Sequence, residues 1–148
     1  MNLKKILTKE SILPQLKAEN KAAAIEELVD FLVHSGKITN RDESLKAVLG
    51  REAKMSTGMQ NGIAIPHGKT DAVNQLHAVI AIKRDGVDFN AMDGEPSTIF
   101  ILTLSPANRA GPHIQFLAEI SKLLGSETMR TKLVQATTAD EILKLLTP

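Results

Sequence analysis

The residue of this chain best suited to chemistry is a histidine between a short apolar run and a loop rich in glycine and hydroxyl groups. His67 follows Ile63-Ala64-Ile65-Pro66 and precedes Gly68. Pro66 biases Ile65 toward an extended backbone and lacks a backbone donor, so the strand predicted at residues 63–65 should end there, with His67 at its end. Gly68 removes side-chain bulk and should let a large group approach the imidazole. The pattern indicates a histidine presented for reaction; the alternative is a solvated loop histidine.

A second histidine occupies a parallel position later in the chain. His113 follows Pro112 and opens a predicted helix after a long apolar strand. Ligands of open α/β sheets bind at loops beyond strand ends, so His67 and His113 converge if their strands are neighbours. The other two histidines are better explained as surface or satisfied groups, because His34 closes an amphipathic helix and His77 begins a predicted strand.

Several familiar site chemistries lack their residues here. The chain has no cysteine, which excludes disulfides, thiolate metal sites and a Cys nucleophile. No His-x-x-x-His or His-Glu-x-x-His run is present, and the carboxylates nearest His67 and His113, Asp71 and Glu119, have no metal-ligand spacing, so no metal is expected. Gly-x-Ser-x-Gly and the phosphate-binding Gly-x-x-x-x-Gly-Lys-Ser/Thr are also missing, and no cofactor is expected.

The chemistry that remains is nucleophilic attack by histidine on a phosphoryl group. A neutral imidazole nitrogen is nucleophilic near pH 7, provided that the other ring nitrogen is held as a donor. Arg51 offers a planar, permanently charged fork for phosphate oxygens, and His113 offers a hydrogen bond to them. Further predicted donors are Ser56, Thr57 and the loop amides. For Arg51 the alternative is a solvated cation at a helix end.

Composition narrows the class of protein. The chain has 148 residues, 43% of them hydrophobic, and residues 1–148 are expected to form one domain. Charged residues make up 24% with a net charge of +1, and Lys and Arg are scattered, which disfavours a nucleic-acid partner. No apolar run is long enough for a membrane span, so a cytoplasmic protein without membrane insertion is expected. Trp and Tyr are absent, so stacking on bases or sugars is not expected.

The elements that must position these residues follow from periodicity and capping. Capping boxes at Asn40 with Glu43 and at Thr138 with Glu141 mark two helix starts. The order of elements predicts an α/β fold, with a small mixed sheet in a three-layer α/β/α arrangement. Helices are predicted at 22–34, 40–54, 114–124, 127–134 and 138–145, and strands at 63–65, 76–82 and 98–104, with a turn at 83–86.

The run Arg51-Glu52, Ser56-Thr57-Gly58 and Asn61 to Thr70, with Ile-Pro-His-Gly at its core, closely resembles the enzyme IIA domain of the fructose/mannitol class of the bacterial phosphoenolpyruvate-dependent sugar phosphotransferase system. Residues 86–89 and 92–96, the strand to Pro106 and the helix opening at His113 resemble the later segments of this family, so the likeness covers nearly the whole chain.

This resemblance implies a fold like that of the mannitol and fructose IIA domains and a role as a phosphoryl relay. His67 would accept the phosphoryl group from an HPr-type phosphocarrier and pass it to a cysteine on a IIB domain of a sugar permease. Arg51 and His113 match the supporting positions of the family. Gln60 stands where the family commonly has Gly. This departure implies a difference in the backbone path of the loop or in its partner-facing surface.

Three hypotheses about function stand side by side. The first is a relay for uptake of a fructose- or mannitol-type sugar. The second is a regulatory protein resembling the nitrogen-related enzyme IIA proteins, which act by phosphorylation-dependent partner binding. The third is a binding module with this fold that no longer transfers phosphate, and the presence of Arg51, His67 and His113 argues against it.

Overall fold

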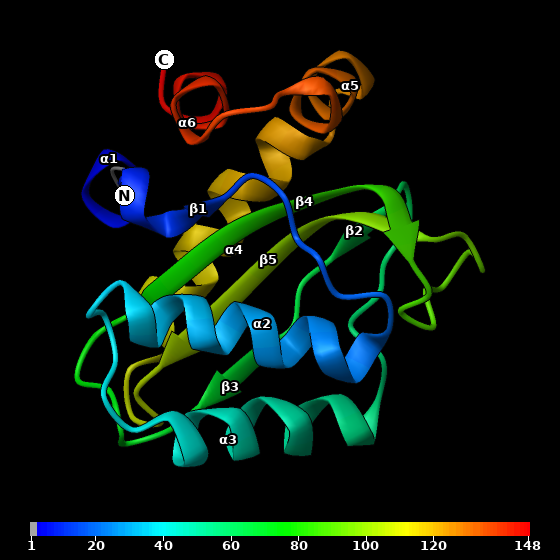
Figure 1. Cartoon of the computed structure of the whole chain (residues 1–148). Coiled ribbons are helices and arrows are strands. Elements are labelled where there is room, and N and C mark those ends of the chain that lie inside the picture. Colours follow the sequence, from blue (N-terminus) through cyan, green and yellow to red (C-terminus); the bar gives the residue numbers. More distant parts are fainter. Residues whose placement is uncertain (1–2) are drawn as a thin grey trace.

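The computed structural model describes residues 3–148, in which a mixed sheet lies between two layers of helices (Figure 1). The three-layer α/β/α arrangement predicted from the sequence is confirmed. In chain order the elements are α1 (Leu3–Ile6), the 3₁₀ turn η1 (Lys9–Ser11), β1 (Ile12–Leu13), α2 (Lys21–His34), α3 (Arg41–Lys54), β2 (Ile63–Ala64), β3 (His67–Lys69), β4 (His77–Val87), β5 (Ser97–Ser105), α4 (Ala110–Leu124), α5 (Glu127–Gln135) and α6 (Ala139–Leu146).

The sheet is built around the antiparallel pair of β4 and β5. Its order is β1-β4-β5-β2, and β3 also pairs with β5 beyond the end of β2. Strands β2 and β3 run parallel to β5, as β1 does to β4. In this register His67 lies opposite Thr103, and His77 lies opposite Leu104. The C-terminal half of β5 therefore determines where the residue after Pro66 is placed.

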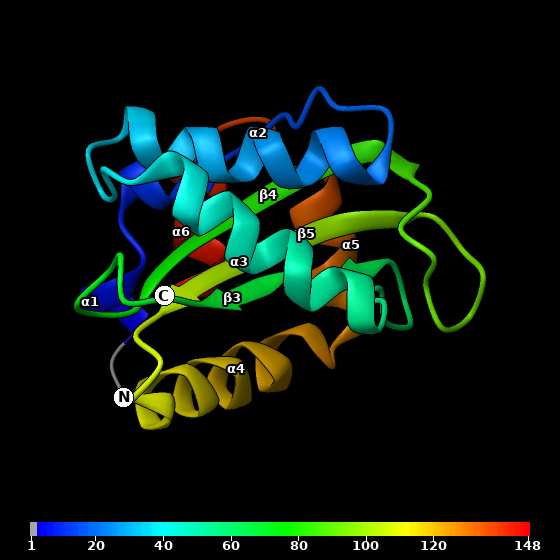
Figure 2. The same ribbon diagram turned by 90° about the horizontal axis from the view of Figure 1, so that it is seen from below.

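Each face of the sheet is covered by its own apolar cluster. On one face α2 and α3 pack through residues such as Leu28 and Val48 against Phe100 of β5. On the other face Phe116 of α4 and Ile142 of α6 belong to a second cluster with residues of β4 and β5. Figures 1 and 2 show these helices on opposite sides of the sheet. Alternate residues of β5 enter the two clusters, as expected for a central strand.

Both predicted helix starts have the N-cap half of the capping box, in which the N-cap side chain accepts from the backbone N–H of the glutamate. Asn40 accepts a hydrogen bond from the backbone N–H of Glu43 (3.2 Å), and Thr138 accepts one from that of Glu141 (3.1 Å). Helix α4 begins at Ala110, before the predicted Ile114, so His113 lies in its first turn.

The predicted turn at residues 83–86 is wrong, because strand β4 continues through it to Val87. The ladder has an irregularity between Ile82 and Val87, and Gly86 has φ +78°, a backbone conformation that L side chains rarely adopt. Arg84 also donates to the carbonyls of Val134 and Gln135 on α5. These contacts between distant parts of the chain favour the strand over the turn that local composition indicated.

The strand predicted at residues 63–65 does end before Pro66, but a new strand begins at His67. His67 therefore lies in the sheet and not in a free loop. The N-terminal elements α1, η1 and β1 were not predicted, since each is too short for a periodic pattern. Among residues 3–148 there is no helix with both the length and the apolar character that crossing a membrane requires.

Candidate active site

Pro66 separates two short parallel strands and orients the residue that comes after it. Its carbonyl accepts a hydrogen bond from the N–H of Thr103 (3.2 Å), while the N–H of Ile65 is bound by the carbonyl of Thr57 (3.0 Å). Because Ile65 donates to Thr57 and Pro66 has no donor, the ladder with β5 is interrupted at these two residues and resumes at β3. Figure 2 shows β3 beside α3, with α4 on its other side. The backbone of His67 is thus fixed by β5 and not by loop geometry.

The imidazole of His67 is held by a backbone carbonyl. Its Nδ1 lies 3.1 Å from the carbonyl oxygen of Ile65. A carbonyl oxygen can only accept, so this bond requires the proton on Nδ1. In the neutral ring the lone pair then lies on Nε2. The geometry meets the condition set for a nucleophilic histidine, and Nε2 is the ring nitrogen that is left with a lone pair.

The structure brings His113 against His67, as the parallel strand-end positions predicted. The two ring centroids are 5.2 Å apart. The side chain of His113 is buried, and its Nδ1 lies 3.1 Å from Oγ1 of Thr103. Burial, followed by the charges of His67 and Lys69, lowers the pKa of His113 to about 4. His113 is therefore neutral at pH 7, and when Thr103 donates to Nδ1 its single N–H lies on Nε2, available to an oxyanion.

An open pocket of about 740 Å³ adjoins His67 on the side of α3. Its basic residues outnumber its acidic ones and come from α3 and from β3. Such a surface favours an approaching phosphoryl group. The lining residues are Glu43, Lys46, Ala47, Gly50, Arg51, Lys54, His67, Gly68, Lys69, Thr70, Asp71 and Ala107.

Arg51 lines this pocket from the last turns of α3. Its Nη1 donates to the carbonyl of Met55 (2.8 Å), which caps the C-terminal end of the helix. This bond uses one of the five guanidinium donors. Arg51 thus combines the helix-end role that was its alternative interpretation with a place in the same pocket as His67.

Gly68 also lines the pocket, but its missing side chain serves a different purpose from the one predicted. A Cβ at this position would lie 2.9 Å from the backbone nitrogen of Val48 and 3.1 Å from Ala47. The glycine therefore allows β3 to pack directly against the backbone of α3. This close contact fixes the pocket wall beside His67.

Ser56 and Thr57 are not among the residues that line this pocket, and their hydroxyls already form hydrogen bonds within the protein. Ser56 Oγ donates to the carbonyl of Phe89 (2.7 Å), and Thr57 donates through both its hydroxyl and its N–H to Glu52. Glu52 is buried and forms an ion pair with Lys21 (2.8 Å), whose ammonium also lies 4.9 Å from the ring centroid of Phe89. The structure thus places Thr57 in a buried network and Ser56 at its half-buried edge, and neither residue lines the pocket of His67.

Sequence reasoning missed Thr103, Glu52 and the basic residues beside His67. A signal existed for Glu52, because it follows Ser44 and Val48 at intervals of four and so shares the buried face of α3. For Thr103 the only signal was its place on a central strand. Its contact with His113 follows from the folded structure and not from any local pattern. In the described part of the chain, no group of three or more His, Asp or Glu side chains is arranged to hold a metal ion.

Residues 5–148 match the family model described as "Phosphoenolpyruvate-dependent sugar phosphotransferase system, EIIA 2". The fructose-specific EIIA component of Haloferax volcanii is 41% identical over 116 residues, which are 78% of this chain and 75% of that protein. The fructose-specific EIIABC component of Bacillus subtilis is 32% identical over 99% of this chain, which spans 23% of the length of that protein.

Two solved structures cover almost the whole chain. The nitrogen regulatory protein IIA-Ntr of Neisseria meningitidis superimposes with a TM-score of 0.87 at 27% identity, covering 97% of each chain. The mannitol enzyme IIA of Escherichia coli, solved in complex with phosphorylated enzyme IIB, gives a TM-score of 0.82 at 29% identity, covering 95% of this chain and 96% of that one.

Proposed function

The chain belongs to the EIIA type 2 family of the phosphoenolpyruvate-dependent sugar phosphotransferase system, and on that premise we propose that it carries its phosphoryl group on Nε2 of His67. Proteins of this family are phosphotransferase components. The observation that supports the acceptor is the bond from Nδ1 of His67 to the carbonyl of Ile65, which leaves the lone pair of Nε2 as the nucleophile.

The donor in this proposal is the phosphohistidine of an HPr-type phosphocarrier protein. The bond between Nε2 of His67 and phosphorus forms as the donor's N–P bond breaks, and the donor imidazole keeps the electron pair of that bond. Because Nδ1 of His67 keeps its proton, the phosphorylated ring gains positive charge, which the Ile65 carbonyl stabilises. No nucleotide or metal enters this balance.

The supporting groups act on the charge that the phosphoryl group brings. A phosphoryl group adds about −2 charge near pH 7. Arg51 has guanidinium donors left over from its bond to Met55, and the lysines that line the pocket contribute positive potential. His113, neutral and buried against the ring of His67, donates from Nε2 to a phosphate oxygen. Phosphoryl transfer depends on such positioning and charge stabilisation.

The onward acceptor in this proposal is a cysteine on the IIB domain of a sugar permease. The mannitol enzyme IIA of Escherichia coli, to which this chain is similar over 95% of its length, has been solved with phosphorylated enzyme IIB. The similarity to the fructose-specific component of Haloferax volcanii favours a permease for a sugar of the fructose or mannitol type.

A regulatory function is the second candidate. The observation that favours it is the IIA-Ntr structure, which superimposes over 97% of both chains. In a regulator the same phosphorylation of His67 would control partner binding. The two functions share the acceptor histidine and differ in the fate of its phosphoryl group.

The test is phosphorylation by phosphoenolpyruvate, enzyme I and HPr, with intact mass and ³¹P NMR as the readouts. We expect the wild type to gain one acid-labile phosphoryl group with the chemical shift of an Nε2 phosphohistidine, and His67→Ala to gain none. His34→Gln is the matched control, since His34 is an exposed histidine at the end of α2, and it should be phosphorylated normally.

Phosphorylation of His67→Ala at the wild-type level would refute the acceptor. A folded wild type that gains nothing from a demonstrably phosphorylated HPr would favour the third hypothesis, a binding module on this fold. Mixing the phosphorylated protein with IIB then separates the remaining two: rapid loss of the phosphoryl group to IIB supports sugar transport, and its retention supports regulation.

A further inference from the structure

A second cleft, of about 530 Å³, lies at the end of the molecule where α1, the end of α2 and the start of α4 meet. Figures 1 and 2 both show these three segments gathered at the same end of the sheet. The cleft is lined by Lys5, Ile6, Gly36, Lys37, Asn74, Gln75, Leu76, His77, Pro106, Arg109 and Pro112. We refer to it as the α1–α4 cleft.

Its charged lining is entirely basic, in contrast to the pocket of His67, which also includes Glu43 and Asp71. Lys5, Lys37 and Arg109 come from three separate segments and converge on one concavity. The side chains of these three residues form no hydrogen bond or ion pair within residues 3–148. Convergent cations that form no ion pair hold a positive potential that a bound anion relieves.

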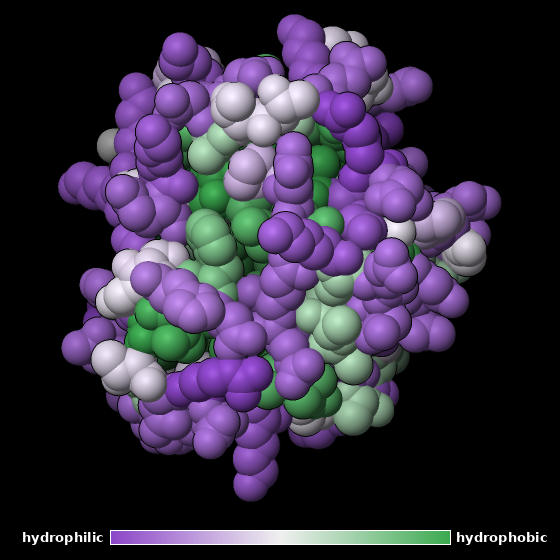
Figure 3. Space-filling view, viewed as in Figure 1, coloured by the Kyte–Doolittle hydropathy of each residue, from purple (hydrophilic) through white to green (hydrophobic). Residues whose placement is uncertain are grey.

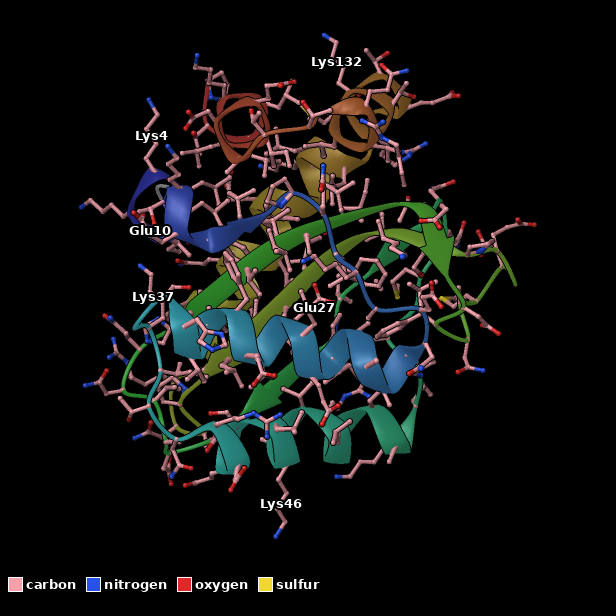
Figure 4. All side chains as sticks on the ribbon, in the orientation of Figure 1. Lys4, Glu10, Glu27, Lys37, Lys46 and Lys132 are labelled. Atoms are coloured by element: carbon pink, nitrogen blue, oxygen red, sulfur yellow. The ribbon has the colours of Figure 1, made fainter. Side chains whose placement is uncertain are left out.

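The surroundings of Lys37 support this interpretation. Figure 4 shows Lys37 at the C-terminal end of α2, on the same side as Glu10. The pKa of Glu10 is lowered by a backbone hydrogen bond, by Thr8 and, to a smaller extent, by Lys37, but Glu10 does not line the cleft. Burial and then Lys37 lower the pKa of His77, which does line it. The positive charge of Lys37 therefore acts on a residue that lines the cleft.

The elements of the cleft fit a small, compact oxyanion. The volume is within the range of small-molecule sites, and Arg109 supplies a planar fork for a phosphate or a carboxylate. Asn74 and Gln75 add side-chain amides that make no hydrogen bond within the described chain. No Phe, Tyr or Trp is among the residues that line the cleft, so a nucleotide base finds no large aromatic platform there.

We propose that the α1–α4 cleft binds a compact dianion, a phosphate monoester or a dicarboxylate, through Lys5, Lys37 and Arg109. This site is separate from the acceptor histidine, although the segment from Pro106 to Pro112 borders both: Ala107 lines the pocket of His67, and Pro112 directly precedes His113. The proposal does not depend on the phosphoryl relay.

The test is an NMR titration of backbone amides with inorganic phosphate and, separately, with succinate, at constant ionic strength. We expect saturable shifts centred on Gly36 and His77 and not on Gly68 and Lys69. The Lys37→Gln/Arg109→Gln double variant should weaken binding by roughly tenfold or more. In the control Lys46→Gln, which removes a cation beside His67, affinity should stay within about twofold of wild type.

The two ligands distinguish the sources of the anion. Stronger binding of phosphate identifies a phosphate monoester as the ligand class, and stronger binding of succinate identifies a dicarboxylate; either supports the cleft. An affinity unchanged in a folded double variant, shifts centred on the His67 pocket, or no saturable binding of either anion would overturn the proposal. His77 gives an independent readout, because a bound anion beside Lys37 should raise the pKa of its ring.

Discussion

The segment Ser56-Thr57 and the strand His67–Lys69 both come after helix α3 and both carry polar side chains, but those side chains are used differently. The hydroxyls of Ser56 and Thr57 are satisfied by Phe89 and by the buried carboxylate of Glu52. His67 uses Nδ1 for a backbone carbonyl and keeps Nε2 free beside a basic pocket. The difference is that the hydrogen bonds of His67 leave one of its polar atoms available to a ligand, whereas the hydroxyls of Ser56 and Thr57 already donate within the protein.

The two regions also differ in what covers them. Thr57 and Glu52 are nearly inaccessible, whereas the pocket of His67 opens between α3 and β3. On the face seen in Figure 3 most of the surface is hydrophilic, and hydrophobic residues are visible mainly in the gaps between elements. The comparison predicts that substitutions in the Glu52 network change stability, and that substitutions around His67 change transfer.

The largest effect is expected from Glu52→Ala. It leaves Lys21, whose side chain is 23% exposed, without its ion-pair partner and removes the acceptor of two bonds from Thr57. The free energy of unfolding should fall by roughly 3–5 kcal/mol, measured by urea denaturation. The fraction that stays folded should still be phosphorylated at close to the wild-type rate.

A matched control for Glu52 is Glu26→Ala, which removes a half-exposed carboxylate that lies 3.7 Å from Arg41. An exposed ion pair contributes little, so this loss should stay below about 1 kcal/mol. Equal losses in the two variants would contradict the division between a structural and a reactive region.

His113 lies at the boundary between the two regions, since it is buried like Glu52 but contacts His67. Its pKa of about 4 in the folded protein lies below the ordinary value of 6.5, so between these pH values the unfolded chain binds more protons. Stability should therefore rise as the pH increases through this window, by on the order of 3 kcal/mol, and be lost on acidification.

Urea denaturation across this pH range, in the wild type and in His113→Asn, measures the contribution of His113. Burial and the charge of Lys37 also lower the pKa of His77, which contributes in the same direction, so the variant should reduce the slope without abolishing it. Identical slopes in the two proteins would show that His113 is not held neutral by burial against its neighbours.

The elements with local signals were predictable from the sequence. Helices α2, α3, α5 and α6 were predicted close to their observed bounds, because the periodicity and caps that set them are local. The meeting of His67 and His113 rested on one further premise, that their strands are neighbours, and the register opposite Thr103 fulfils it. The sequence could therefore predict that His67 and His113 lie close together, once the order of their strands was assumed.

Other features depend on partners that are distant in sequence. Strand β3 resumes after Pro66 only because Thr103 to Ser105 of β5 are there to pair with it. Gly68 was interpreted as room for a ligand, yet the space is taken by the backbone of Val48. Ser56 and Thr57 look like phosphate donors until Glu52 is placed on the buried face of α3. No local sequence pattern distinguishes a hydroxyl that is hydrogen-bonded within the protein from one that is available to a ligand.

Arg51→Ala should affect transfer more than stability. The variant removes the guanidinium from the pocket of His67 and one hydrogen bond to Met55 at the end of α3. Phosphorylation by HPr should slow by roughly tenfold or more, since a charge-assisted contact to the phosphoryl group is lost. The control is Lys54→Ala, which removes another cation that lines the pocket from the same turn of the helix. It separates the loss of the Arg51 guanidinium from the loss of one positive charge. An Arg51→Ala protein with the wild-type transfer rate and melting temperature would contradict the role of this residue.

The smallest effect is expected from Ser56→Ala, and it tests the comparison most directly. The variant removes the hydroxyl that donates to Phe89 and accepts from the N–H of Gly58 (3.1 Å), so stability should fall by about 1 kcal/mol. If Ser56 were a phosphate ligand, its loss would slow phosphorylation while stability changed little. Because its hydroxyl is already bonded to Phe89 and Gly58, the transfer rate should instead stay within about twofold of wild type. Rapid-quench phosphorylation by HPr beside urea denaturation of the same protein separates the two cases, and slowed transfer at unchanged stability would move Ser56 from the buried network to the site of His67.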